Sequence, residues 1–486
     1  MIASLAIAMV VLPAAAALLC AFLKEKARWV ALAGVLLVSA AVVWLALSTF
    51  GRSYSSVVGD LPWLHGLVTT PVFGILVDPL SLLMLLVVVP VGFLTVLYST
   101  SYLSERNREH AVGSGQYGRY YFWLLLFIGS MVGVALSPNF LQLLVFWELT
   151  TVCSWALISF YQDERSLRAG FKAMLMTQAG GAFLVVVVLI LFVRTGSVEF
   201  SALSALPSGL RNLVFVFVLI AAWAKAAQVP LQTWLPDAME APTPISAYLH
   251  AAAMVKAGVY LMARTVSGGL AISPGISALM AGMALLTIFV ALSFYFIQDD
   301  LKRLLAWSTI AHLGYVFLGI AIGTLGVPLG YRGGVLHILC HGVSKATLFF
   351  CVGAIAYTTG SRSISGLHGL ARRMPLTAMA FFVGVLSVTG IPPLGCFWSK
   401  FMIVAGAMRL PGAAGPLIVT LILCETLISF GWMLYIAQKV FQGPMLAPVP
   451  VVSDPPWALR VTLIALMIGC LTAPMAGIPL VQFMGK

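Results

Sequence analysis

Residues 221–264 read AAWAKAAQVPLQTWLPDAMEAPTPISAYLHAAAMVKAGVYLMAR, and this stretch decides the fold. An apolar helical pattern carries Lys225, breaks at Pro230 and resumes through Lys256. Since a proline inside a helix removes one backbone donor and displaces the carbonyl four residues earlier, Pro230 is expected to free the carbonyl of Ala226. Irregular backbone at membrane depth is tolerated only where protein or a wet cavity surrounds it. A lysine beside such a break therefore indicates an ion or proton site.

The composition is that of a polytopic membrane protein. Hydrophobic residues make up 61% of the chain and charged residues 9%, with a mean hydropathy of +1.05. The apolar runs have the length of about 20 residues that a bilayer core requires, and they lack the short alternation of a transmembrane β-barrel. We therefore predict an all-α fold of about fourteen transmembrane helices, at residues 2–23, 29–50, 76–99, 119–136, 140–160, 171–193, 212–238 (broken at Pro230 and Pro236), 244–264, 272–297, 303–323, 333–357, 376–408 (broken), 415–441 and 457–482.

The net charge of +12 reflects orientation in a membrane and predicts no nucleic-acid partner. If the N-terminus lies outside, fifteen of the 27 lysines and arginines fall in cytoplasmic loops, Lys302 among them, and seven fall on the outer side. This positive-inside bias predicts both termini on the outer face of a prokaryotic inner membrane. Asp237 and Glu240 are predicted to be helix-end and loop charges on the cytoplasmic side. The first span lacks a preceding basic segment, so we expect a retained helix and not a signal peptide.

A second broken helix lies five spans after the first. In GIPPLGCFWSK (390–400), two glycines and two prolines precede Lys400, just as a break adjoins Lys225. Because five is odd, two such five-helix units must have inverted topology. The predicted domains are three N-terminal helices at 1–118, a first repeat at 119–266, a second repeat at 267–441, and a C-terminal helix at 442–486 that follows a proline-rich connector at 442–456.

Four lysines and two glutamates lie inside predicted spans, and each would cost about 2.5–3.5 kcal/mol at the centre of a bilayer if it faced lipid. They are therefore expected to face the interior of the bundle. Glu148, in VFWELTTVCSW, is predicted to be the counter-ion of Lys225, with a purely structural acid as the alternative. Moving either partner of such a pair changes the protonation of the other, which is what a pump element requires.

Three titratable groups follow one another along one helix in HILCHGVSK. His337, His341 and Lys345 are spaced i, i+4 and i+8, which places them on one stripe about 12 Å long. Such a stripe is typical of a hydrogen-bonded proton relay. A metal site is the competing interpretation, but two histidines without a third ligand make a weak one. His312, in STIAHLGYV, is predicted to join the relay, with a satisfied core histidine as the alternative.

The remaining charged groups in the spans fall on the two halves of the chain. His250 and Lys256 lie six residues apart in one predicted helix, so they are expected to face different neighbours. Lys256 is predicted to bridge the two halves, and Lys400 to end the path in the second half. Glu425 fits a static salt bridge as well as it fits a place in the path.

No motif predicts a cofactor in this chain. All seven cysteines lie in apolar spans without a CxxC, so we predict buried, inert thiols and no ligands for an iron–sulfur cluster or zinc. The segment GSGQYG (113–118) satisfies GxGxxG. No strand precedes it and a membrane span follows it, so a dinucleotide site is not predicted.

These motifs give the sequence a family resemblance. It resembles the antiporter-like subunits shared by respiratory complex I, the group 4 membrane-bound hydrogenases, including formate hydrogenlyase types, and the Mrp cation/proton antiporters. The matching motifs are FWELTTVCSW (146–155), residues 224–264, LKRLLAWSTIAHLGY (301–315), HILCHGVSKATLFF (337–350) and GIPPLGCFWSKF (390–401). The resemblance implies a fourteen-helix inverted-repeat fold and a proton path along a central hydrophilic axis, through Glu148, Lys225, His250, Lys256, His312, His337, His341, Lys345 and Lys400.

Two departures limit what the resemblance transfers. The chain ends soon after its last span, so we expect no long lateral helix of the kind found in the most distal complex I subunit. The segment TQAGGAF (177–183) carries no charge, although some complex I relatives have one there.

Two functions fit the sequence. The first is a proton-translocating subunit of a redox-driven complex, either complex I-like NADH:quinone oxidoreductase or group 4 hydrogenase. Iron–sulfur clusters, flavin or a nickel–iron site are then expected only in partner subunits, in a peripheral redox arm. Moving one charge against 100 mV costs about 2.3 kcal/mol, so a partner must drive the motion. The second is a subunit of an Mrp-type Na⁺/H⁺ antiporter or another ion-coupled transporter. Under both, the chain contacts other membrane subunits and lipid; an inert scaffold is the third alternative.

Overall fold

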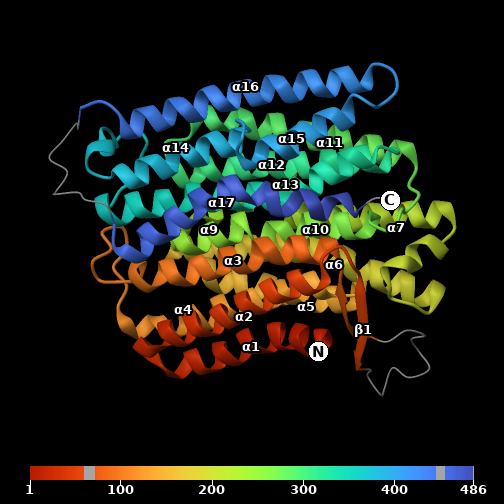
Figure 1. Cartoon of the computed structure of the whole chain (residues 1–486), viewed down its shortest axis with the longest axis horizontal. Helices are drawn as coiled ribbons and strands as arrows, with labels where there is room; N and C mark the ends of the chain where they lie inside the picture. Colours follow the sequence, from red (N-terminus) through yellow and green to blue (C-terminus); the bar gives the residue numbers. More distant parts are fainter. Residues whose placement is uncertain (60–71, 445–454, 485–486) are drawn as a thin grey trace.

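The computed structural model describes residues 1–59, 72–444 and 455–484, so most of the predicted connector at 442–456 lies outside the described residues. Helices with roughly parallel axes lie side by side (Figure 1). Their bounds are α1 (Ile2–Phe22), α2 (Ala27–Thr49), α3 (Pro79–Tyr102), α4 (Tyr117–Leu136), α5 (Phe140–Ile158), α6 (Glu164–Thr195), α7 (Ser208–Lys225), α8 (Trp234–Asp237), α9 (Thr243–Ala251), α10 (Met254–Val266), α11 (Pro274–Ser293), α12 (Leu301–Thr324), α13 (Pro328–Thr359), α14 (Pro375–Thr389), α15 (Gly395–Ala407), α16 (Ala414–Phe441) and α17 (Trp457–Gln482).

The predicted all-α membrane fold is confirmed. Within the described ranges, 13 helical segments, with α9 and α10 counted together, are long and apolar enough to cross a membrane. The shorter apolar helices α14 and α15 together cover the predicted broken span at 376–408 and make up the count of about fourteen. The chain is therefore an integral membrane protein. The inverted repeat and the domain boundaries stay predictions.

A short β-hairpin interrupts the helical pattern in the predicted loop at 51–75. Strand β1 (Tyr54–Gly59) pairs antiparallel with β2 (Phe73–Val77). Gln142 on α5 fixes the hairpin to the bundle, because its side chain accepts a hydrogen bond from Gly74 N at 2.9 Å and donates one to Gly74 O at 3.0 Å. The sequence analysis missed β2 because its apolar run continues directly into the next membrane span.

The first helix break lies earlier than predicted. Helix α7 ends at Lys225, five residues before Pro230, and Pro236 lies inside the short helix α8 instead of breaking one. The carbonyl of Ala226, which Pro230 was expected to free, accepts a hydrogen bond from Gln228 Nε2 at 2.9 Å. The chain thus satisfies the freed backbone group with its own side chain, as an irregular segment at membrane depth requires.

The predicted continuous helix at 244–264 is wrong, because α9 and α10 are separate. The backbone N–H groups of Ala252 and Ala253 both donate to Tyr248 O, at 3.0 and 2.9 Å, and Ala253 has a ψ of −104°. No proline or glycine marks this interruption in the sequence, so helical periodicity alone could not show it. The second predicted break is confirmed: α14 ends at Thr389 and α15 begins at Gly395.

Helix α13 occupies the middle of the bundle. It contacts α3, α9, α10, α12, α14, α15 and α17. Together with α12 and the α9–α10 pair, it is one of the most enclosed spans. In Figure 1, α1 lies along one edge of the bundle and α16 along the opposite edge. Lys345 on α13 is therefore shielded from lipid by the surrounding helices.

Gly258 lets α10 pack closely against α7. A Cβ at this position would lie 2.5 Å from Ala222 O and 3.1 Å from the Ala226 side chain. We expect Gly258→Ala to lower stability by about 1–3 kcal/mol, the usual cost of overpacking. The control is Gly282→Ala in α11, where a Cβ would meet nothing within 4 Å. Thermal unfolding of the purified protein in detergent is the measurement, and equal midpoints for the two variants would contradict the prediction.

Candidate functional site

Lys225 lies at the end of α7 and is held by α5. Its side chain is fully buried, and Nζ donates to Trp147 O at 2.8 Å and to Thr151 Oγ1 at 2.7 Å. The same ammonium lies 4.6 Å from the centre of the Trp147 ring. Lys225 is the last residue of α7, and its side chain joins this helix end to α5. The sequence analysis did not identify Thr151, although it lies within the quoted motif FWELTTVCSW.

The predicted contact between Glu148 and Lys225 is not formed. Among the described residues, no ion pair within 4 Å joins these two side chains. Lys225 bonds instead to Trp147 O and Thr151 Oγ1, which flank Glu148 on α5. The carboxylate points toward α6, where its Oε1 would lie 2.2 Å from a Cβ on Gly181. That oxygen has no hydrogen-bond partner in the described part of the chain. The two charges interact through space, so the role of Glu148 stays a prediction.

Lys256 and three histidines form the centre of the candidate site. Lys256 Nζ lies 2.7 Å from His341 Nδ1, and the His341 ring stacks on His312 with centroids 5.1 Å apart. His312 Nδ1 lies 3.0 Å from His337 Nε2, and His337 Nδ1 lies 2.8 Å from Ser399 Oγ. These side chains are all fully buried and come from α10, α12, α13 and α15. The predicted relay stripe on α13 is therefore extended sideways by partners from other helices.

Lys345 and His250 have no hydrogen bond to these four side chains or to Ser399. Lys345 Nζ donates to Leu305 O on α12 at 3.3 Å. His250 lies between Trp234 and Phe349, with ring centroids 6.5 and 5.7 Å away. Both of its ring nitrogens lack a hydrogen-bond partner among the described residues. The structure thus brings Lys256 into contact with His341 of the relay stripe, whereas Lys345 of that stripe and His250 bond to neither.

Lys400 lies beside the second helix break. Its Nζ lies 3.8 Å from Glu425 Oε2 and 3.2 Å from Thr426 Oγ1, and it is 4.6 Å from the centre of the Tyr315 ring. Tyr315 donates a hydrogen bond to the same Glu425 oxygen. The open question about Glu425 therefore has a geometric answer: it is the ion-pair partner of Lys400. Whether it also takes part in a path is a separate matter of function.

Tyr315 connects the Lys400 group to the central histidines. Its ring centroid lies 5.7 Å from that of His312 and 5.8 Å from that of His337. The sequence analysis missed Tyr315 and Ser399, although each has a local signal. Tyr315 follows His312 by three residues, which places both on one face of α12, and Ser399 directly precedes Lys400.

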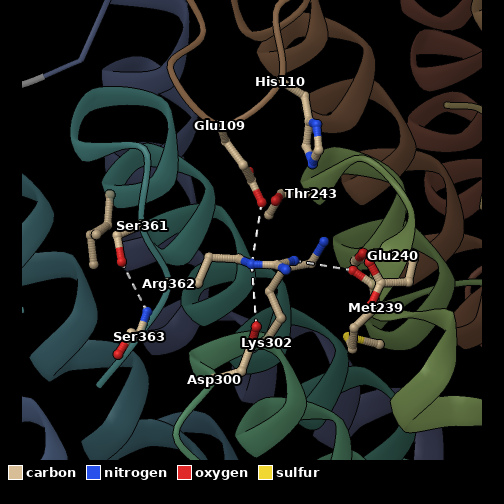
Figure 2. Close-up of polar contacts among 12 residues, drawn as sticks. Glu109, His110, Met239, Glu240, Thr243, Asp300, Lys302, Ser361, Arg362 and Ser363 are labelled. Carbon is tan, nitrogen blue, oxygen red and sulfur yellow. Dashed lines mark hydrogen bonds and ion pairs between the residues drawn. The ribbon is translucent and has the colours of Figure 1, made fainter. Parts of the chain in front are cut away.

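A cluster of charged side chains lies where α13 ends and α12 begins. Figure 2 shows Arg362 between Glu109, Asp300 and Glu240. Arg362 Nε lies 3.3 Å from Glu109 Oε1 and 3.3 Å from Asp300 Oδ2. Burial disfavours the guanidinium, but these carboxylates raise the pKa of Arg362 above its usual value. This residue therefore stays charged and ties three segments distant in sequence together.

Lys302 was wrongly assigned to a loop. It lies in the first turn of α12, only 1% exposed, and Nζ donates to Ala241 O at 2.7 Å. The assignment failed because the sequence places Lys302 next to the start of a helix but does not show that the segment at Ala241 packs over it. Asp237 and Glu240 do end α8 and the following turn, as predicted. They form ion pairs with Lys172 at 2.7 Å and Arg303 at 3.7 Å.

Metal-ligating side chains do not gather in the described ranges. No group of three or more histidine, cysteine, aspartate or glutamate residues there could hold a metal ion. Six cysteines are buried, but Cys424 on α16 is exposed, which contradicts the prediction that all seven are buried. The prediction was wrong because an apolar stretch of sequence on an edge helix can face lipid as well as the protein interior.

A central segment that contains all nine predicted path residues defines the family. Residues 137–429 match the family described as NADH:quinone oxidoreductase/Mrp antiporter, TM. The chain belongs to this family. Residues 63–121 match a second description, NADH-ubiquinone oxidoreductase (complex I), chain 5 N-terminus. Membership in the NADH:quinone oxidoreductase/Mrp antiporter family confirms the resemblance that the motifs indicate.

Relatives in this family include two kinds of subunit. Chloroplastic NAD(P)H-quinone oxidoreductase subunit 5 of Anthoceros angustus is 38% identical over 356 residues, which cover 68% of this chain and 46% of the relative. The same subunit of Citrus sinensis is 36% identical, with 76% and 50% covered. Na⁺/H⁺ antiporter subunit A1 of Staphylococcus haemolyticus is 36% identical, with 74% and 45% covered. The chain thus spans about half the length of these curated relatives.

Solved structures share the fold over nearly the whole chain. A chain of the Mrp complex from Dietzia sp. DQ12-45-1b superposes with a TM-score of 0.85 and 30% identity, over 99% of this chain and 51% of that chain. A chain of an archaeal membrane-bound sulfane sulfur reductase gives a TM-score of 0.81 at 23% identity, over 98% and 96%. The second likeness concerns the fold alone.

Proposed function

We propose that this chain is the proton-translocating, antiporter-like membrane subunit of a redox-driven complex, of the NADH:quinone oxidoreductase or group 4 membrane-bound hydrogenase type. The observation that carries the proposal is the buried series from Lys256 through His341, His312 and His337 to Ser399. Isolated buried lysines are costly in a membrane, and ionisable groups kept inside a bundle mark ion or proton relays. The many relatives named as quinone oxidoreductase subunit 5 support the redox-driven assignment.

In the proposed path, most steps join groups that already lie within hydrogen-bond reach. Lys256 exchanges a proton with His341, and the two other histidines extend the exchange toward Ser399 and Tyr315. Ring stacking is not a proton contact, so the step from His341 to His312 needs a water or a small ring motion. The path residues are those predicted from the sequence: Glu148, Lys225, His250, Lys256, His312, His337, His341, Lys345 and Lys400.

The two helix breaks give the proposed path its ends. Lys225 adjoins the first break and Lys400 the second, and each lysine is held by contacts that a small movement of one helix changes. We further propose that residues 119–266 and 267–441 are inverted repeats, flanked by helices at 1–118 and 442–486. Both termini then lie on the outer face of a prokaryotic inner membrane, following the distribution of basic loop residues.

The energy for transport comes from partners. Translocation against a membrane potential requires about 2.3 kcal/mol per charge and 100 mV, and the proposed path holds no source of it. We propose that other membrane subunits contact this chain within lipid, and that iron–sulfur clusters with flavin or a nickel–iron site lie in a peripheral arm.

An Mrp-type Na⁺/H⁺ antiporter subunit is the second candidate function. The superposition on the Dietzia Mrp complex covers 99% of this chain, and Staphylococcus haemolyticus antiporter subunit A1 is among its relatives. The same buried lysines and histidines would serve proton movement in either complex. The two functions differ in what drives the proton and in whether Na⁺ is exchanged for it.

Purification of the intact complex through a tag on this chain separates the two functions. We expect mass spectrometry to find subunits with iron–sulfur motifs together with an NADH-binding or nickel-binding subunit. Only small membrane subunits, combined with Na⁺-dependent proton movement in vesicles, would favour the antiporter. The tagged chain must still support growth. This requirement ensures that an incompletely assembled complex is not mistaken for the smaller antiporter.

A further inference from the structure

A buried arginine lies at the far end of the helix that carries Lys256. Arg264 on α10 is only 3% exposed. Its guanidinium is paired with both carboxylate oxygens of Asp78, with Nη2 2.8 Å from Oδ1. It also donates to Ser81 Oγ at 2.9 Å and to Tyr260 OH at 2.8 Å. The arginine is therefore held rigidly in one orientation.

Asp78 is anchored as firmly as its partner. It caps α3 by accepting a hydrogen bond from Ser81 N at 2.8 Å. Burial alone would raise the pKa of this carboxyl, but the adjoining Arg264 guanidinium outweighs burial and holds the pKa below its ordinary value. The pair is therefore charged on both sides at neutral pH.

Arg264 lies on the same face of α10 as the central lysine. Lys256, Tyr260 and Arg264 are spaced i, i+4 and i+8, which makes one stripe about 12 Å long. Tyr260 lies between the two cations, and its hydroxyl donates to Ala135 O at 2.7 Å while it accepts from Arg264. The face of α10 that carries Lys256 therefore ends in a tyrosine and an arginine that are hydrogen-bonded to each other.

Two cavities open beyond the arginine. One, of about 350 Å³, is lined by Arg264 itself together with Glu199, Ser201 and Ser267. The other, of about 310 Å³, is lined by Val266, Ser267 and Tyr331. Since a water molecule takes about 30 Å³ of liquid volume, the first cavity has room for several waters next to the guanidinium. The first cavity therefore reaches the guanidinium at the end of α10 that lies away from Lys256.

We propose that Arg264, held by Asp78, is an electrostatic seal that keeps protons of the central relay from escaping into the cavity at the end of α10. Asp78 offsets part of the charge of Arg264, but the guanidinium that lines the cavity still raises the energy of a second positive charge beside it, as an arginine does where it excludes protons from membrane pores. The inference rests on the proposed proton-translocating function. In this inference Arg264 acts through its charge and Asp78 holds it in position. Neither residue exchanges the transported proton.

The seal is tested by neutralising both members of the pair while keeping a polar side chain at each position. In vesicles that contain the whole complex and no redox substrate, Arg264→Gln with Asp78→Asn is expected to raise passive proton conductance under an imposed pH gradient. We expect an increase of about tenfold or more, equivalent to about 1.4 kcal/mol of barrier. A pH-sensitive dye inside the vesicles is the readout. Where the double variant does not assemble, Arg264→Gln alone keeps the Asp78 cap on α3 and gives the same readout.

Two further variants decide what the leak means. Adding Lys256→Ala to the double variant is expected to abolish the leak, since the relay would then be interrupted. A leak that persists without Lys256 reflects damage to the bundle and overturns the proposal, as does a double variant that stays tight. Arg332→Gln is the control, because Arg332 donates to Met484 O at 2.8 Å near the same end of the bundle and is not on the stripe. Failure of the proposed function gives a different result. In that case pumping survives Lys225→Ala, regardless of the proton leak measured for the Arg264 variants.

Discussion

Replacing Lys225 with alanine is expected to reduce proton translocation by the reconstituted complex by about 10²-fold or more, the usual contribution of a positioned acid–base group. The ammonium is fully buried and makes two hydrogen bonds to α5 at 2.7 and 2.8 Å. Alanine removes both the titratable group and the contact between the end of α7 and α5. The measurement is acidification or alkalinisation of sealed vesicles during turnover, normalised to the rate of the driving reaction.

The control for Lys225 is a lysine whose side chain is exposed. Lys26→Ala, at the exposed turn before α2, is expected to leave translocation unchanged. Glu148→Ala provides a second check, because its carboxylate interacts with Lys225 only through space. If translocation survives both Lys225→Ala and Glu148→Ala, the chain is a scaffold and the proposed path is wrong.

The second large effect is expected at the Lys400–Glu425 pair. Glu425 is fully buried and Lys400 is nearly so. Glu425→Ala leaves Lys400 without its carboxylate, and breaking a buried pair in this way costs about 3–5 kcal/mol of stability. Unfolding of the purified protein in detergent measures the loss. The same variant is expected to lose translocation, because Tyr315 loses the acceptor that orients its hydroxyl.

A double variant separates the structural part of this effect from the functional part. Lys400→Met with Glu425→Leu replaces the pair by apolar side chains of similar volume, which is often neutral or stabilising. We therefore expect stability to return while translocation stays lost. Normal translocation in the double variant would show that the pair is a static salt bridge and that the path does not end at Lys400.

Much of the fold could be predicted because hydrophobic length and proline position are local properties. The break at 390–394 was predicted correctly because its glycines and prolines lie together. The stripe of His337, His341 and Lys345 followed from helical spacing alone. The break after His250 could not be predicted, because it falls in three consecutive alanines, which by themselves favour a continuous helix.

The site was predicted less completely, because its contacts join segments far apart in the chain. Spacing along one helix cannot show that Lys256 meets His341, 85 positions away. It also cannot show that Lys302 is buried and donates to Ala241 O, 61 positions away. The Glu148–Lys225 contact was predicted from charge alone, and it fails because the Glu148 side chain points toward Gly181 on α6.

The interruption between α9 and α10 has a further consequence for the middle of the bundle. A helix end leaves backbone N–H and C=O groups without partners inside the helix, and here two such ends meet between His250 and Lys256. In an enclosed apolar core, unpaired backbone groups of this kind demand small polar partners. The backbone between His250 and Lys256 is therefore a place in the core where a buried water would find hydrogen-bonding partners.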